Sequence, residues 1–273
     1  MTKHRSAFAL VSCLAAFAPP ASAVPITVGA AGPDAADIQA TVDAFRAALG
    51  EPNNGNSPGP LGSGRREINW DGGGSTDTSV AGNPFTGFQD TRGATMTTPG
   101  TGFVQAPVEG LAIQFSQPTH ATSFASFTPV RLFSPIGSNV TDVTFSIPGS
   151  MGATLASVSA FGVVFSDVDL QSTTTMQLFG QGDVPLGEPF PVPAAPGDAT
   201  FAFLGVRFED GTPITRVRIT TGNAAPELAD GPGMDVVMMD DFIYSEPVPE
   251  PGTLALLALG LVGLRAMGCP RRA

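Results

Sequence analysis

From Arg65 onward the sequence consists of short runs of β-forming residues, each bounded by Gly, Pro, Asn or Asp. Val, Ile, Thr and Phe dominate these runs, which favours strands. The runs are REINW, LAIQF, TSFASF, DVTFSI, FGVVFSDVDL, TMQLF, TFAFLGVRF, ITRVRIT and DVVMMDDFIY. About ten strands with no helical pattern between them predict an all-β fold, a single antiparallel β-sandwich of jelly-roll type. This domain is expected to occupy residues 65–247.

Residues 34–49 carry the one clear helical pattern. Apolar side chains recur there at steps of three or four, which makes one stripe along a helix. The stripe consists of Ile38, Val42, Phe45 and Leu49. Asp34 precedes the helix as a cap, and Gly50 follows it where a positive φ is favoured. Residues 24–64 are therefore expected to form one N-terminal helix, docked on the sandwich, and one Gly/Pro/Asn loop.

The N-terminal residues read as an export signal. Basic residues 3–5 precede an apolar run over 7–18, and Ala21-Ser22-Ala23 is a small-residue cleavage site. This order predicts a secretory signal peptide over residues 1–23. Leu10–Cys13 also resembles a lipobox, which would lipidate Cys13, but the apolar sequence continues beyond Cys13 and favours the signal peptide.

Composition excludes several classes of function. Cys13 and Cys269 are the only cysteines and both lie in the terminal segments, so the body has no disulfide, thiolate zinc site or Cys nucleophile. The chain has a net charge of −11, and all 24 carboxylates lie within residues 24–251. Such a surface repels nucleic acids and anionic lipids, so no nucleic-acid partner is expected.

The C-terminal residues 248–273 combine three features. Pro249-Glu250-Pro251 precedes an apolar run, Leu254–Leu264, and Arg271 and Arg272 follow near the end. The run spans only about 16 Å as a helix, against roughly 30 Å of membrane hydrocarbon. Residues 253–269 are therefore expected to insert into the inner membrane only transiently, as a short transmembrane helix.

Together these features resemble the PEP-CTERM sorting signal of Gram-negative bacteria, although Arg265 interrupts the apolar segment early. In that family the membrane protease exosortase reads the Pro-Glu-Pro motif and releases the protein to the cell surface or extracellular matrix. The resemblance implies export, exosortase as a partner, a sorting role for Arg271 and Arg272, and an association with exopolysaccharide.

Two pairs of carboxylates suggest binding sites. Asp167 and Asp169 should share one face at a strand end, and Asp240 and Asp241 should lie one on each face of the last strand. An Asp among apolar residues must be paired, hydrogen-bonded or metal-bound. The pattern MDDFIY is similar to the late-strand Asp that holds structural Ca²⁺ in carbohydrate-binding jelly rolls.

Oxygen ligands from the first strand of the body would complete such a Ca²⁺ site. The candidates are Glu67, Asn69 and Asp71. The alternative is that these aspartates cap turns or pair with arginines of later strands. The candidate arginines are Arg207, Arg216 and Arg218.

Trp70 and Tyr244 are the only Trp and Tyr, and each lies near a carboxylate in the sequence. Either ring can serve as a sugar platform, but packing in the core is the competing interpretation. Ser57 lies in a formal G-x-S-x-G motif within a loop, and His120 is the only histidine of the body. A nucleophile elbow needs a strand-to-helix turn, so no Ser hydrolase is expected.

Three functions remain open from the sequence. The first is a non-enzymatic exported surface or matrix protein, and the second is a calcium-dependent carbohydrate-binding module. The third is a glycoside-active enzyme that uses two carboxylates. Its candidate acids are Glu67, Glu109, Glu188 and Asp169.

Overall fold

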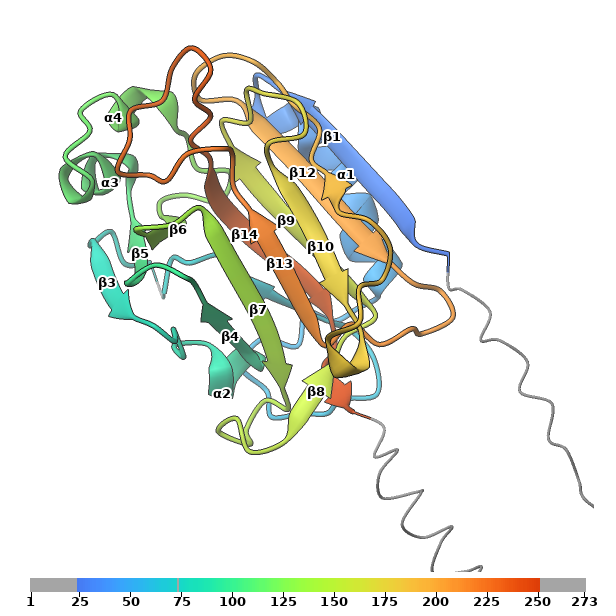
Figure 1. The fold of residues 1–273 in the computed structure, drawn as a ribbon. Coiled ribbons are helices and arrows are strands. Elements are labelled where there is room, and N and C mark those ends of the chain that lie inside the picture. The colour runs from blue at the N-terminus through green and yellow to red at the C-terminus, as the bar shows by residue number, and fades with distance from the viewer. Residues whose placement is uncertain (1–23, 73, 251–273) are drawn as a thin grey trace, which may run out of the picture.

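A computed structural model describes residues 24–72 and 74–250. These residues form two antiparallel sheets that pack face to face (Figure 1), which confirms the all-β class. The first sheet follows the order β1 (Ile26–Gly32), β12 (Phe201–Arg207), β9 (Ala160–Ser166), β14 (Met238–Ser245), β6 (Leu132–Ile136), β5 (Gly102–Ala106) and β3 (Ser79–Gly82). β2 (Arg65–Ile68) pairs with the end of β14.

The second sheet closes the sandwich. Its order is β11 (Phe190–Pro191), β10 (Thr175–Phe179), β13 (Arg216–Thr220), β7 (Val140–Ser146), β8 (Leu155–Ser157) and β15 (Val248–Pro249), with β4 (Ala94–Thr97) paired to β7. Aromatic side chains join the two sheets: Phe145 of β7 lies 5.5 Å from Tyr244 of β14, measured between ring centres. Alternation along each strand thus builds one core between the sheets.

Short helices fill the connections. They are α1 (Ala35–Leu49), α2 (Gln89–Arg92), α3 (Val108–Gln114), α4 (His120–Ser123) and the 3₁₀ turn η1 (Gln181–Asp183). The expected strands LAIQF and TSFASF were wrong, because they fall on α3 and on α4 with the chain after it. Leu111 and Phe115 are buried while Ile113 between them is 81% exposed, which is a helical spacing.

The prediction for α1 is confirmed. Asp34 and Asp37 form a capping box at its start, and Gly50 ends it with φ of 91°. Ile38, Val42 and Phe45 are buried, and Leu49 packs at the edge of the same cluster. The helix lies against β1 and β12 on the outer face of the first sheet (Figure 1), so this sheet is covered on both faces there.

Two glycines make room for the ring of Phe45. Gly162 of β9 and Gly205 of β12 face each other in the register of the two strands. A Cβ at Gly162 would approach the Phe45 ring to 2.7 Å, and one at Gly205 would approach it to 2.6 Å. The side chain therefore sits over a gap in the sheet that only glycine leaves open.

β1 was missed by the sequence analysis, which assigned only a helix and a loop to residues 24–64. All seven residues of β1 pair with β12, from Ile26 opposite Arg207 to Gly32 opposite Phe201. The strand is rich in Gly and Ala, which have low β-propensity. Its pairing with β12 and its contact with α1 hold it in the sheet, so the sandwich begins before Arg65.

Within the described part of the chain, no helix is both long and apolar enough to span a membrane. The predicted signal peptide over 1–23 and the predicted membrane-inserting segment over 253–269 lie outside the described residues, as do Pro251, Arg271 and Arg272.

Candidate functional site

The predicted calcium ligands do not form one site. Asp240 and Asp241 lie at a β-bulge, where the register to β9 shifts between Met239 and Phe242. The prediction of one carboxylate on each face was wrong, because the bulge turns both to the outer face. There Asp240 Oδ2 accepts hydrogen bonds from the backbone N–H groups of Phe127 (2.6 Å) and Thr128 (3.2 Å). Burial, and then the negative charge of Asp241, raise the pKa of Asp240.

An arginine occupies the position expected for the metal. Arg46 of α1 donates from Nη2 to Asp241 Oδ2 at 2.8 Å and from Nε to Glu67 Oε2 at 3.1 Å. Glu67 also accepts from Arg65 Nε at 2.6 Å. Asn69 lines the same small pocket, so the structure does bring Glu67, Asn69 and Asp241 together. They surround a guanidinium, and the calcium prediction for this place is corrected accordingly.

Asp71 serves a different purpose. Its Oδ1 accepts hydrogen bonds from the backbone N–H groups of Val130 (2.7 Å) and Arg131 (2.9 Å). It therefore fixes the turn that leads into β6, as a turn-capping Asp does. The alternative of pairing with late-strand arginines is wrong for all these aspartates. Arg216 and Arg218 both pair with Asp142, and Arg207 pairs with Glu209.

Trp70 and Tyr244 are core residues. Both are 0% exposed, so neither ring can serve as a sugar platform, and that prediction was wrong. Trp70 stacks on Phe133 with ring centres 3.8 Å apart, and its Nε1 donates to the backbone oxygen of Asp240 at 2.8 Å. Tyr244 Oη donates to the backbone oxygen of Arg92 at 3.0 Å. The competing interpretation, packing in the core, is confirmed.

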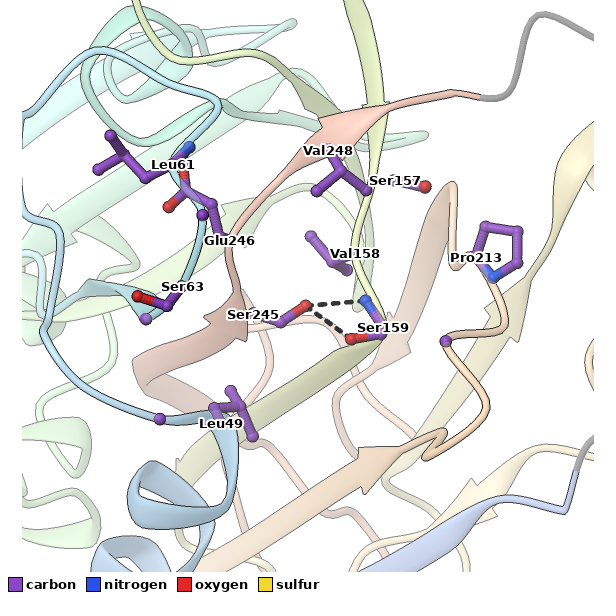
Figure 2. Close-up of a pocket in the computed structure, with 14 residues that line it drawn as sticks. Leu49, Leu61, Ser63, Ser157, Val158, Ser159, Pro213, Ser245, Glu246 and Val248 are labelled. Atoms are coloured by element: carbon purple, nitrogen blue, oxygen red, sulfur yellow. Dashed lines mark hydrogen bonds between the residues drawn. The ribbon is translucent and has the colours of Figure 1, made fainter.

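A pocket of about 360 Å³ lies beside the last strands (Figure 2). Ser245 Oγ accepts a hydrogen bond there from the backbone N–H of Ser159 at 2.8 Å. Glu246 is the acid of this pocket, and both of its oxygens are bound by Arg66. Among the residues that line it, no basic side chain contacts a serine hydroxyl. These residues therefore do not form an activated serine nucleophile.

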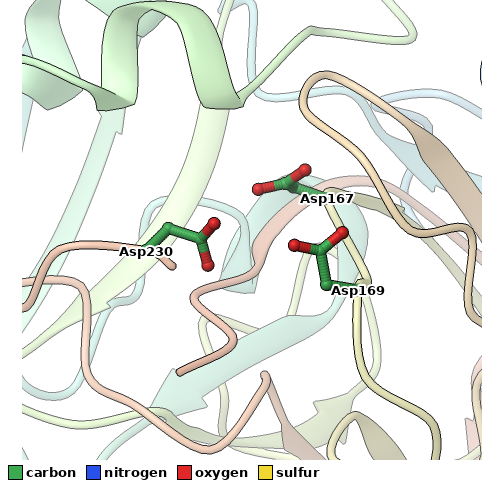
Figure 3. A group of neighbouring side chains, drawn as sticks. All are labelled: Asp167, Asp169 and Asp230. Carbon is green, nitrogen blue, oxygen red and sulfur yellow. The ribbon is translucent and has the colours of Figure 1, made fainter. Parts of the chain in front are cut away.

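A cluster of carboxylates lies at the end of β9 (Figure 3). Asp167 and Asp169 follow this strand, and Asp230 comes from the connection between β13 and β14. One oxygen from each side chain lies within 4.8 Å of the others. Asp167 and Asp169 therefore do lie together, as strand alternation predicted. Asp230 was missed, because its loop has no pattern that fixes where it folds back.

Backbone contacts position each member of this cluster. Asp167 has a φ of 73°, and its N–H donates to the backbone oxygen of Thr200 at 3.0 Å. Asp169 Oδ1 accepts from the N–H of Gly197 at 2.7 Å, and Asp230 Oδ1 accepts from the N–H of Val236 at 3.0 Å. The geometry gathers three acidic side chains from two distant segments.

The cluster is strongly negative. Burial, and then the negative charges of four neighbouring aspartates, raise the pKa of Asp167 to about 9. The four are Asp230, Asp169, Asp198 and Asp235. Burial also raises the pKa of Asp235, whose oxygens accept from the N–H groups of Asp169 and Leu170 and from the hydroxyl of Thr173. Carboxylates held this close favour a proton or a cation among them.

His120 supports the neighbouring loop. Its ring is fully buried, 5.0 Å from the ring of Phe124, and its Nε2 lies 2.8 Å from the backbone oxygen of Pro226. The carbonyl can only accept, so Nε2 carries the N–H, and this contact ties the ring to the loop at Pro226. Burial lowers its pKa.

This burial predicts a loss of stability in acid. The unfolded chain binds a proton at His120 below pH of about 6.5, whereas the folded chain resists it. The free energy of unfolding should therefore fall by up to about 1.4 kcal/mol per pH unit below that value. Urea unfolding of the protein and of His120→Gln from pH 7.5 to 5 tests this. The buried aspartates, which respond in the opposite sense, are common to both proteins. A stability difference that stays constant with pH would contradict the prediction.

The sorting motif begins on the folded domain. Val248 and Pro249 of β15 pair with Ser157 and Ala156 of β8, and Glu250 N donates to the backbone oxygen of Leu155 at 3.3 Å. The first two residues of Pro-Glu-Pro thus lie at the edge of the second sheet.

Comparison with protein-family models finds the PEP-CTERM protein-sorting motif at residues 247–272. The motif implies export, processing by exosortase and sorting to the cell surface. No curated protein and no solved structure matches the chain.

Proposed function

We propose that this protein is a non-enzymatic component of the cell surface or extracellular matrix, with a body of jelly-roll type that associates with exopolysaccharide. The observation that carries the proposal is the PEP-CTERM motif at residues 247–272, which begins next to β15, the last strand of the sandwich, and includes it. Delivery by exosortase places the folded body outside the cell, after transient passage through the inner membrane.

The three glutamates among the carboxylates considered for glycoside chemistry support a non-enzymatic role. Glu67 pairs with Arg46 and Arg65, so it is not available as a proton donor. Glu109 of α3 and Glu188 of the loop before β11 are exposed on separate elements. Glycoside hydrolysis needs two acids on either side of one bond, roughly 5–9.5 Å apart.

Association with exopolysaccharide is tested by sedimentation. The exported protein should pellet with exopolysaccharide prepared from the producing cells and stay soluble with dextran of similar size. The polysaccharide should keep its length during the incubation. A protein that remains in the supernatant in both cases would overturn the association, and shortening of the polysaccharide would overturn the non-enzymatic role.

Replacing Pro249 and Pro251 with alanine should stop sorting. The motif read by exosortase is lost while the body keeps its fold, so the protein should accumulate in the inner membrane with its C-terminal residues intact. Membrane fractionation followed by mass measurement checks this. Pro189→Ala with Pro191→Ala is a matched control, because these exposed prolines have the same spacing. Normal release of the Pro249/Pro251 variant would contradict the sorting role.

A calcium-dependent carbohydrate-binding module is the second candidate, favoured by the carboxylate cluster at the end of β9. Repeating the sedimentation in Ca²⁺ and in EDTA separates the two. Binding that disappears in EDTA favours the module, and equal binding in both favours the calcium-independent matrix protein.

A further inference from the structure

Asp167 is a buried carboxylate without a partner. Its side chain is 0% exposed, and neither Oδ1 nor Oδ2 has a hydrogen-bond partner among the described residues. Asp71, Asp240 and Asp241 are also buried, but each has one oxygen bound by backbone N–H groups or by Arg46. A carboxylate buried without a partner is unfavourable as a charge, so either a proton or a cation must compensate Asp167 at this position.

The free oxygens of two other side chains point to the same place. Figure 3 shows the carboxylates of Asp169 and Asp230 turned toward that of Asp167. Asp169 lies in the segment after β9, and Asp230 lies in the connection between β13 and β14. Asp169 and Asp230 each use Oδ1 for one backbone N–H, which leaves Oδ2 available as a ligand. The three side chains thus present at least four oxygens that the described residues leave unused.

No ion pair within the described part of the chain offsets the negative charge there. Asp198 and Asp235 add to the negative field around the three carboxylates. No arginine of the described residues forms an ion pair with any of these five aspartates, whereas Asp142, Asp183 and Asp241 elsewhere in the fold all have one. An external cation would offset the mutual repulsion.

We propose that Asp167, Asp169 and Asp230 bind one Ca²⁺ ion, which ties the connection between β13 and β14 to the end of β9. Oxygens within 4.8 Å of one another can all contact a central ion at the Ca–O distance of about 2.3–2.6 Å. Backbone carbonyls and water complete the coordination of Ca²⁺ in such sites. Mg²⁺ requires near-octahedral contacts of about 2.0–2.1 Å and retains several waters, which suits a buried carboxylate less well.

The site differs from the one the sequence suggested, because no residue of the MDDFIY strand contributes. Ca²⁺ binding here requires neither exosortase nor exopolysaccharide, so the site and the proposed function can fail separately. Three carboxylates in an extracellular module give an expected Kd of roughly 0.1–1 mM.

Calorimetric titration of the purified protein with CaCl₂, together with melting curves in Ca²⁺, Mg²⁺ and EDTA, tests the site. Ca²⁺ at about 100 times Kd should raise the melting temperature by about 5 °C over EDTA. Mg²⁺ at the same concentration should raise it less. Melting curves that are identical in Ca²⁺ and EDTA would overturn the site, and a larger shift with Mg²⁺ would overturn its assignment to calcium.

The Asp167→Asn variant tests whether Asp167 is a Ca²⁺ ligand, and its melting temperature in EDTA shows whether the variant still folds. This variant should lose the Ca²⁺ response, yet in EDTA it should melt no lower than the unchanged protein, because a neutral amide is no less favourable at this buried position than a carboxyl group without a partner. Asp230→Asn should weaken Ca²⁺ binding at least tenfold. Asp210→Asn, in the turn after β12, is the matched control and should keep the full response. A full response in Asp167→Asn would overturn the proposal.

Discussion

Replacing Glu246 with alanine should lower the free energy of unfolding by about 3–5 kcal/mol, because it leaves a buried arginine without its partner. Arg66 is 0% exposed and donates two hydrogen bonds of 2.7 Å to the Glu246 carboxylate, one to each oxygen. Asn54 Nδ2 (2.8 Å) and Leu61 N (3.1 Å) donate to the same group. The change therefore breaks the contacts that hold the 51–64 loop to the last strand.

Urea unfolding followed by circular dichroism measures this effect. Glu209→Ala is the matched control, since Glu209 makes one exposed ion pair with Arg207 and should cost less than about 1 kcal/mol. Arg66→Met combined with Glu246→Leu removes both charges, so it should cost less than Glu246→Ala alone. Equal effects of Glu246→Ala and Glu209→Ala would show that the buried pair does not anchor the loop.

Replacing Phe45 with alanine should cost about 3–5 kcal/mol. The ring is 1% exposed, packs against Phe203 with centres 5.5 Å apart, and fills the gap over Gly162 and Gly205. The sheet strands cannot close a gap made by missing side chains, so a cavity remains and the helix loses its main contact. A melting temperature unchanged by Phe45→Ala would mean that α1 does not stabilise the sandwich.

The glycine gap provides a sharper version of the same experiment. Gly205→Ala should destabilise the unchanged protein, because its new Cβ meets the Phe45 ring. In the Phe45→Ala background the same methyl group has room, so Gly205→Ala should lower the free energy of unfolding clearly less than it does in the unchanged protein. The two changes should therefore be non-additive by about 0.5–3 kcal/mol in a double-mutant cycle. Simple additivity would place the Phe45 ring elsewhere.

The sequence predicted several strands whose apolar residues are dense and regular. TMQLF matches β10 residue for residue, and DVTFSI lies within or next to β7. The sequence analysis did not predict the Gly/Ala-rich β1, the short strands β3, β4, β8, β11 and β15, or the inner strands β5 and β6. Their positions depend on partners far away in the chain, such as β12 for β1. Local propensity cannot report such pairing.

The candidate site was also predictable only in part, because the sequence shows local spacing but not contacts between distant segments. Asp167 and Asp169 are two residues apart, so alternation alone placed them together. Asp230 joins them through a loop from β13, and the tertiary fold decides that contact. The prediction of a Ca²⁺ site at Asp240 and Asp241 was wrong for two reasons. A bulge in β14 places both side chains on the same face of the sheet, and Arg46 of α1 forms an ion pair with Asp241. The bulge is defined by the pairing of β14 with β9, which the sequence of β14 alone does not reveal.

The mass of the protein recovered from the cell surface tests exosortase sorting most directly. Processing at both ends predicts a species that lacks Met1–Ala23 and the residues after the Pro-Glu-Pro motif, and that contains the whole sandwich from β1 to β15. A surface species that retains Arg271 and Arg272 would contradict exosortase processing.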